Sequence, residues 1–203
     1  SVATVITSDD IEAMGATSIH QALETVTGLH VYPSKLNRMN ASYSVRGIHT
    51  DQNSQVLVLV NGIRTTYGFT GAKWNLFELG TNVIDRIEVI KGPGSAMFGA
   101  DAFSAVINIV TKDYNHTPSL ELGVKFGSFD SKGSWLSGKT QVGELNLSTN
   151  IQWQSTDGDP SRIVESDYLH QIGMQDISLA PGPLDTRLRY LDAHFDATYH
   201  NTN

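Results

Sequence analysis

Histidines and carboxylates are the residues with which this sequence could perform acid–base or metal chemistry. Seven His residues lie at positions 20, 30, 49, 116, 170, 194 and 200, and none belongs to an HExxH motif. Asp192, His194 and Asp196 alternate, so on a strand they would share one face, where a divalent ion could bind. A hydrated row of polar side chains is the simpler interpretation, and we predict no metal site.

Two short motifs resemble ion-binding loops without completing them. Asp157-Gly158-Asp159 resembles the start of a calcium loop, but the downstream Gly and Glu positions do not fit. Gly92-Pro93-Gly94 resembles a phosphate-binding turn, but no Lys follows it and Pro93 lacks an N–H donor. The chain also has no GxSxG motif and no Cys. We therefore expect no catalytic residues, no enzyme activity and no cofactor.

Composition narrows the class of protein further. The 203 residues carry a net charge of −7, which argues against a nucleic-acid partner. The longest aliphatic run, Val56–Val60, is far shorter than the ~20 residues of a membrane-spanning helix. Charge is uneven, because residues 1–113 carry −2 and residues 114–203 carry −5. This difference coincides with a change in the hydrophobic pattern.

Residues 1–113 combine signals for short helices and short strands. Ser18 and Gln21 have capping-box spacing and predict a helix near 18–25, and Asp9-Asp10 begins a shorter one. Gly15 and Gly28 lie where these helices would end. The predicted strands are Val2–Thr7, Tyr43–Ile48, Val56–Val60, Ile87–Ile90 and Ala105–Thr111. This half therefore reads as a small α+β domain.

Details of this half predict local geometry. The uninterrupted apolar run Val56–Val60 indicates a strand covered on both faces, and Asn61-Gly62 after it favours a tight turn. Ser95 is a plausible N-cap for a short helix that ends at Gly99. Arg86 and Glu88 alternate with apolar residues, so we expect both on the face opposite the apolar one.

Residues 114–203 alternate strictly between apolar and polar residues in segments of about ten. The clearest segments are 120–126, 145–153 and 191–199, with a weaker one near Ser134–Val142. A very short connection follows Val142, whereas Gln154 to Arg189 is long and polar. Membrane β-barrel strands and a soluble antiparallel sandwich both show this alternation. Four strands cannot close a barrel of at least about eight, so we expect a piece of a larger protein.

The residues from Val83 to Lys112, VIDRIEVIKGPGSAMFGADAFSAVINIVTK, closely resemble the plug of TonB-dependent outer-membrane receptors. Three more blocks match in order: Asp10 to Gly28, Ser44–Ile48 (SVRGI) and Val56–Arg64 (VLVLVNGIR). The family commonly has Pro where this chain has Thr27 and Asp where it has Asn61, and neither difference changes the expected fold. We find no TonB-box segment between Ser1 and the first of these blocks, and we expect the energy-coupling element to lie outside this chain.

The resemblance implies an α+β fold: a plug with a small mixed β-sheet and short helices over residues 1–113, then antiparallel strands from the start of an outer-membrane β-barrel over residues 114–203. It implies a transporter in the outer membrane of a Gram-negative bacterium, in contact with lipid and driven by TonB through a segment outside this chain. The expected cargo is a ferric siderophore. Haem, cobalamin or a carbohydrate are alternatives, as is a secreted α+β module that binds partners without transport.

Two loops, Leu36–Tyr43 and Tyr67–Trp74, would face the ligand in such a receptor. Their aromatic and cationic residues suit ferric chelates, and the candidates are Arg38, Tyr43, Tyr67, Phe69, Lys73 and Trp74. Packing of these aromatics in the plug's own core is the alternative. Arg46, Arg86 and Glu88 are implied at the seam between plug and barrel, with a solvated ion pair as the alternative for the last two. Open strand edges in residues 114–203 predict association between chains.

Overall fold

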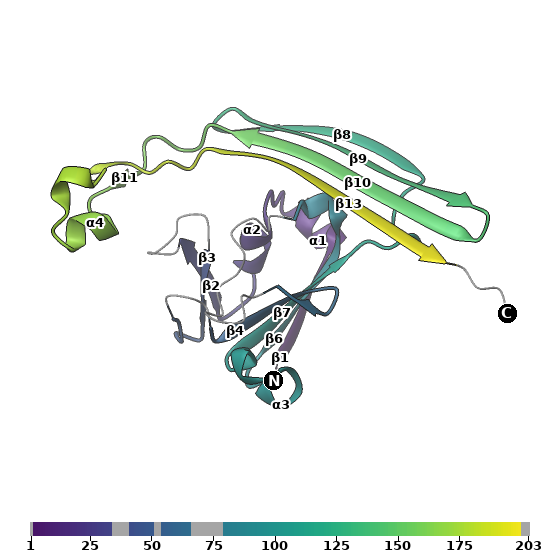
Figure 1. The fold of residues 1–203 in the computed structure, drawn as a ribbon, viewed down its shortest axis with the longest axis horizontal. Coiled ribbons are helices and arrows are strands. Elements are labelled where there is room, and N and C mark those ends of the chain that lie inside the picture. Colours follow the sequence, from purple (N-terminus) through teal and green to yellow (C-terminus); the bar gives the residue numbers. More distant parts are fainter. Residues whose placement is uncertain (1, 34–40, 51–53, 66–78, 200–203) are drawn as a thin grey trace. The chain divides into compact units, whose positions relative to one another are not determined.

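The computed structural model describes residues 2–33, 41–50, 54–65 and 79–199 (Figure 1). The chain divides into two compact units, Ser1–Lys112 and Asp113–Asn203. Each unit is built around its own β-sheet. Among the described residues, no helix has the length and apolar character needed to cross a bilayer.

The first unit is organised by a five-stranded mixed sheet. Its strands, in spatial order, are β1 (Val2–Thr7), β6 (Ile84–Lys91), β7 (Ala105–Thr111), β4 (Val56–Val60) and β5 (Ile63–Arg64). All neighbouring pairs are antiparallel except β4 and β7, which run parallel. The predicted bounds of β1, β4 and β7 are confirmed, and the sheet is mixed as expected.

Two short helices follow β1, and each begins at a capped residue. Helix α1 (Ser8–Ala13) starts after Thr7, whose hydroxyl accepts from the Asp10 N–H while the Asp10 carboxylate accepts from the Thr7 N–H. Helix α2 (Ile19–Leu23) starts after Ser18, as predicted. The capping box expected there is incomplete, because the Gln21 side chain accepts from the Thr17 N–H instead. Gly15 and Gly28 adopt positive φ, as the helix ends require.

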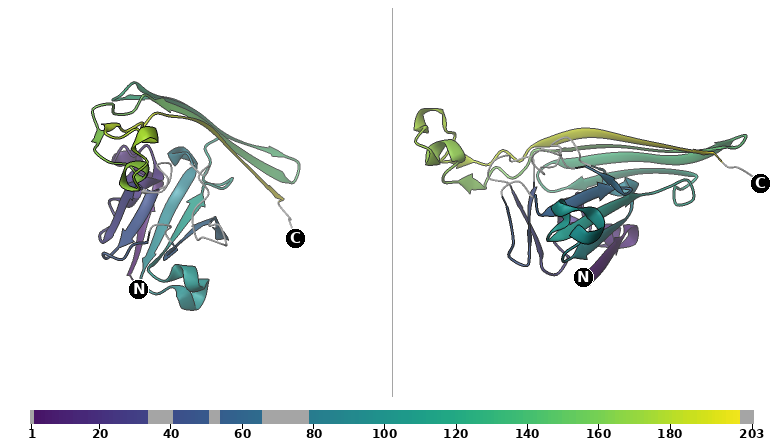
Figure 2. Two further views of the ribbon diagram at one scale, coloured as in Figure 1. Left: turned by 60° about the vertical axis from the view of Figure 1, so that its left-hand side comes forward. Right: turned by 60° about the horizontal axis from the view of Figure 1, so that its bottom comes forward.

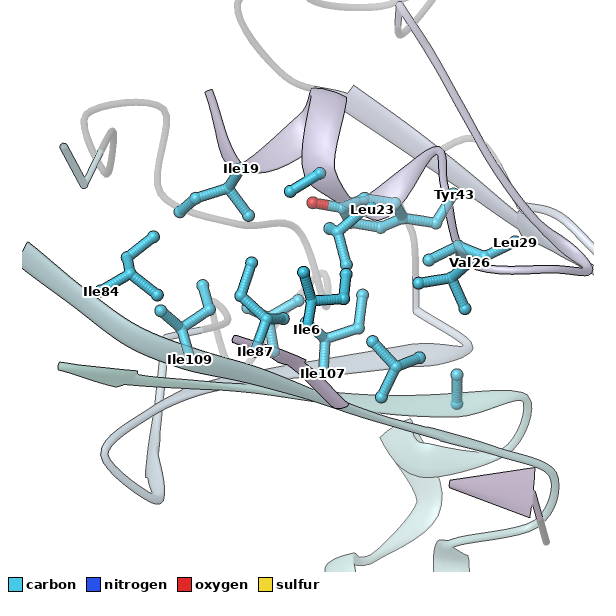
Figure 3. Close-up of a cluster of buried hydrophobic side chains, with 14 of the residues drawn as sticks. Ile6, Ile19, Leu23, Val26, Leu29, Tyr43, Ile84, Ile87, Ile107 and Ile109 are labelled. Carbon is cyan, nitrogen blue, oxygen red and sulfur yellow. The ribbon is translucent and has the colours of Figure 1, made fainter. Parts of the chain in front are cut away.

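The main hydrophobic core lies on one face of this sheet, beneath α2 and the hairpin of β2 (Leu29–Pro33) and β3 (Ala41–Val45) (Figure 3). Leu23, Tyr43, Ile87 and Ile107 are completely or almost completely buried in it. A second, smaller cluster joins Leu57, Leu59, Ala102 and Val106. Because Val56 and Val58 belong to the main core while Leu57 and Leu59 belong to the second cluster, β4 is covered on both faces, as predicted.

Three local predictions needed correction or extension. Strand β3 ends at Val45 rather than Ile48, because Arg46 and Gly47 adopt φ of 52° and 83° and turn the chain. Strand β6 is longer than expected, and a 3-10 helix (Thr81–Val83) leads into it. Helix α3 (Ser95–Phe98) begins at Ser95, so Ser95 is inside the helix and does not precede it; another 3-10 turn (Ala100–Ala102) follows.

The second unit is a four-stranded antiparallel sheet (Figure 2). Its spatial order is β13 (Leu188–Tyr199), β10 (Leu145–Thr156), β9 (Ser131–Val142) and β8 (Leu120–Gly127). The four predicted strands are thus confirmed, each with extended bounds. The long connection between β10 and β13 has structure of its own: β11 (Ile163–Val164), α4 (Tyr168–Gln171), a 3-10 turn (Gln175–Ile177) and β12 (Gly182–Pro183).

The two faces of this second sheet differ in polarity and in exposure. Large apolar side chains on one face are exposed, among them Leu122 at 72% and Phe195 at 71%. Asn150 and Gln152, on the other face, are buried. Asn150 donates to the Ser137 hydroxyl at 2.6 Å, and Gln152 donates to the Tyr190 hydroxyl at 3.3 Å. The sheet therefore has an outward-facing apolar surface and an internally bonded polar surface.

Candidate functional site

Most of the predicted ligand-contacting residues lie outside the described residues: Arg38, Tyr67, Phe69, Lys73 and Trp74. The structure does describe the elements that carry their loops. Strands β2 and β3 form an antiparallel hairpin whose last pair, Pro33 with Ala41, flanks residues 34–40. Residues 66–78 follow Thr65, whose N–H and hydroxyl both donate to the Val58 carbonyl, at 3.1 Å and 3.0 Å. The described residues next to both of these segments therefore belong to, or are hydrogen-bonded to, strands of the first unit.

Tyr43 is the exception, and its position corrects the prediction. The residue belongs to strand β3 rather than to a loop, and it is 0% exposed in the main core. Its hydroxyl lies 3.5 Å from Nδ1 of His20, and its carbonyl accepts from the Gln55 side chain at 2.9 Å. The alternative of core packing therefore holds for Tyr43, because its ring fills the space between the hairpin and the sheet.

Sequence reasoning missed a cluster of three rings, two on the other face of the same hairpin and the third, His49, just beyond its end. His30 and Tyr32 stack with ring centroids 5.8 Å apart, and Tyr32 meets His49 edge-on at 6.2 Å. His30 and Tyr32 alternate with Leu29 and Val31, which pack in or against the core. This two-residue period could have revealed β2, which was not among the strands predicted from the sequence.

Arg86 and Glu88 lie on one face of β6, as predicted, and form an ion pair. Arg86 Nε donates to the Glu88 carboxylate at 2.8 Å, and its terminal nitrogen donates to Asp85 at 2.8 Å. The second Glu88 oxygen accepts from the Asn108 side chain at 2.9 Å. The Asn108 hydrogen bond, with the ion pair to Arg86, lowers the pKa of Glu88 below its ordinary value. Glu88 and Asp85 in turn raise the pKa of Arg86.

Arg46 is held in an unusual backbone conformation for a residue with a long side chain. Its N–H donates to the Gly28 carbonyl at 2.8 Å, and Val45 and Ile48 exchange hydrogen bonds of 2.9 Å and 3.0 Å across the turn. The residue is exposed. A left-handed non-Gly residue costs about 1 kcal/mol or more, so surrounding contacts must fix this turn. Its place at a plug–barrel seam stays a prediction.

Arg64 is a further charged residue that sequence reasoning did not select. It is ion-paired with Asp101, and its other terminal nitrogen donates to the Phe98 carbonyl at 3.0 Å. These contacts tie β5, immediately before residues 66–78, to the end of α3 and the turn that follows. Only the fold reveals this contact, because the partners lie 37 residues apart.

The two possible metal-ion sites, at Asp192–Asp196 and at Asp157–Asp159, gain no support from geometry. Within the described residues, no group of three or more His, Cys, Asp or Glu side chains could hold a metal ion. Asp192, His194 and Asp196 pair in register with Gln152, Asn150 and Ser148, so they continue the polar face of the second sheet. Asp159 accepts from both the N–H and the hydroxyl of Ser161, which lowers its pKa.

The chain thus combines a small α+β unit with an antiparallel sheet that has one exposed apolar face, the architecture that the resemblance to outer-membrane receptors implies. The family model of the TonB-dependent Receptor Plug Domain matches residues 1–106, and the chain belongs to this family. The fold class and the outer-membrane location in a Gram-negative bacterium follow from that membership and from the relatives below.

Similar proteins come from several bacteria. The Vitamin B12 transporter BtuB of Vibrio vulnificus (strain CMCP6) is 40% identical over 108 residues, covering 53% of this chain and 17% of that protein. The crystal structure of the ferric yersiniabactin uptake receptor FyuA from Yersinia pestis is 28% identical, with a TM-score of 0.64 over 78% of this chain and 24% of that one. A mutant ferric enterobactin receptor (PfeA) from Pseudomonas aeruginosa covers 98% of this chain and 30% of its own, with a TM-score of 0.65 at 21% identity, and supports the fold alone.

Proposed function

We propose that this chain is the plug portion, with adjoining barrel strands, of a transporter that binds a ferric siderophore and gates its uptake. The observation that carries the proposal is the similarity to the ferric yersiniabactin uptake receptor, at 28% identity over 78% of the chain. The chain spans only 24% of that receptor, so transport is proposed for the protein of which such a plug is a part.

In this proposal, the residues 34–40 and 66–78 receive the ligand, and the plug core transmits its binding. Arg64, which precedes residues 66–78 in the sequence, contacts Asp101 and Phe98 and so the segment around α3. Ligand binding at residues 66–78 would change the contact of Arg64 with Asp101 and Phe98. A contact that differs between the free and the bound state would couple the ligand site to the segment around α3. TonB then acts on the plug to open the passage.

The proposal also assigns contacts to the predicted seam residues and to the exposed apolar face of the second sheet. Arg46, Arg86 and Glu88 would contact the barrel wall, where Arg86 and Glu88 act as a preformed ion pair. The exposed apolar face of the second sheet, with Leu122, Val124 and Phe195, would contact outer-membrane lipid.

Ligand titration of the 203-residue chain in detergent micelles tests the proposal. Fluorescence of its three Trp residues is followed while iron(III) enterobactin, iron(III) desferrioxamine, cyanocobalamin or haemin is added. We expect saturable binding of a ferric chelate and none of the iron-free chelator. Failure of both ferric chelates to bind would refute a siderophore cargo.

Cobalamin is the second candidate cargo, and one observation favours it. Over 108 residues this chain is 40% identical to the Vitamin B12 transporter BtuB, a higher identity than that to the siderophore receptors named above. Saturable binding of cyanocobalamin without binding of either ferric chelate would select this candidate.

A further inference from the structure

His30, Tyr32 and His49 form a continuous surface of rings, here called the ring surface. Tyr32 lies in the middle, stacked on His30 with 25° between the ring planes and in edge contact with His49 at 83°. The His30 side chain is 68% exposed, His49 is exposed and Tyr32 is half-buried. Two exposed imidazoles that each contact the half-buried ring of Tyr32 offer both ring faces and polar edges to a ligand.

The ring surface is not part of the plug core. The core side of the hairpin consists of Leu29, Val31, Tyr43 and Val45. Because successive side chains of a strand point to opposite faces, His30 and Tyr32 point away from that core. Exposed rings contribute little to folding, so packing alone does not account for their arrangement.

Hydrogen bonds fix both imidazoles in one tautomer. His30 Nδ1 lies 3.3 Å from the Glu24 carboxylate, which can only accept, and that carboxylate is itself fixed by the Val31 N–H at 2.7 Å. His49 Nδ1 lies 3.4 Å from the Gly47 carbonyl, which also can only accept. Nδ1 is therefore the protonated nitrogen in each neutral ring, assigned from its partner. Nε2 is left in both rings to accept a hydrogen bond.

We propose that the ring surface binds the aromatic rings of a catecholate- or phenolate-type ferric chelate, a proposal that rests on the proposed function and specifies its cargo. Stacking against Tyr32 and His49 recognises the ring of the ligand, and Nε2 of His30 or His49 accepts from an amide or hydroxyl of the same ligand. A hydroxamate chelate has no ring to stack, so the ring surface discriminates between the two classes.

Binding of two ferric chelates by paired variants tests this assignment. The probes are iron(III) enterobactin, a tricatecholate, and iron(III) desferrioxamine, a trihydroxamate, titrated into the full chain. Tyr32→Leu removes the central ring, Tyr32→Phe keeps it, and His49→Asn is an independent second site. Tyr114→Leu is the control, because Tyr114 lies in the other unit beneath Lys139. Circular dichroism verifies that each variant is folded.

We expect Tyr32→Leu and His49→Asn to raise the Kd for the tricatecholate about three- to tenfold, the range of an aromatic pair contact. Tyr32→Phe and Tyr114→Leu should leave that Kd unchanged, and none of the variants should alter trihydroxamate binding. An unchanged Kd for the tricatecholate in both Tyr32→Leu and His49→Asn would overturn the proposal that the ring surface binds the ligand. An equal rise in Kd for the two chelates would overturn it as well. Binding of the trihydroxamate alone by the unsubstituted chain would overturn it while leaving a siderophore cargo standing, whereas binding of neither chelate would overturn both proposals.

Discussion

Asn61 and Thr111 form a reciprocal hydrogen-bonded pair across 50 residues of sequence. The Asn61 side-chain amide donates to the Thr111 hydroxyl at 2.8 Å, and the Thr111 N–H donates to the Asn61 side-chain oxygen at 2.9 Å. The pair joins the β4–β5 turn, where Asn61 has a φ of 50°, to the last residue of β7. One side chain thus fixes both a left-handed turn and the end of the central sheet.

Replacing Asn61 with Ala should destabilise the plug unit by about 2–3 kcal/mol. Two hydrogen bonds are lost at roughly 1 kcal/mol each, and a left-handed Ala adds about another 1 kcal/mol. Urea denaturation measures the loss, and the Thr111 amide should exchange its hydrogen faster. Asn61→Asp is the matched control: its carboxylate accepts from both Thr111 groups, so we expect a change within about 1 kcal/mol. An equal loss in the Asp variant would show that the amide donor, rather than the acceptor, is required.

The Glu88 network should make plug stability depend on pH. Because the folded-state pKa of Glu88 is lowered, its contribution is present above the ordinary Glu pKa and is lost as pH falls through the folded value. The side chain is 33% exposed, so we expect less than about 1 kcal/mol. Urea midpoints of the unsubstituted chain and Glu88→Gln, compared from neutral pH into the acid range, should converge as the carboxylate protonates. A difference that stays constant or widens on acidification would contradict this assignment.

The elements of the fold were largely predictable because their signals are local. Alternation identified all four strands of the second unit, and the run Val56–Val60 identified a strand covered on both faces. The end of β3 was not predictable from strand propensity, because the sequence predicts a strand that continues to Ile48. The left-handed Arg46 and its hydrogen bond to Gly28, 18 positions earlier in the sequence, end the strand there.

The candidate site was less predictable, because its contacts join distant segments. The Arg86–Glu88 pair followed from alternation within one strand, and the structure contains it. The Arg64–Asp101 pair and the contact of Tyr32 with His49 depend on tertiary packing, which no local pattern encodes. Tyr43 was assigned to a ligand loop because its segment combines aromatic residues with a cation, but its place on β3 directs its ring into the core.

The Trp135 ring of β9 lies over Gly123 on the neighbouring strand β8, where the absence of a side chain leaves room for it. The two residues are register partners, and a Cβ on Gly123 would lie 1.9 Å from the indole of Trp135, whose Nε1 donates to Glu121 at 2.7 Å. Gly123→Ala should therefore displace the ring, break this hydrogen bond and shift Trp emission. Gly138→Ala is the control, since its Cβ would meet its nearest neighbour at 3.5 Å. Adding Trp135→Ala to Gly123→Ala should restore stability lost in the single variant, and no recovery would refute a steric cause.

The outer strands of the second sheet should cause the chain to associate in the absence of detergent. Among the described residues, β8 and β13 each pair with one strand only, so each has an edge with free backbone donors and acceptors. On β8 that edge adjoins an exposed apolar row, with Leu122 at 72%, Val124 at 67% and Phe126 at 79% exposed. Light scattering should detect oligomers, and lowering the apolar character with Leu122→Lys and Val124→Lys should reduce them, because charges on an edge strand oppose pairing. Met97→Lys and Phe103→Lys, at exposed residues of the first unit that lie outside its strands, are the control and should leave the oligomers unchanged. A monodisperse monomer without detergent would exclude association through these edges.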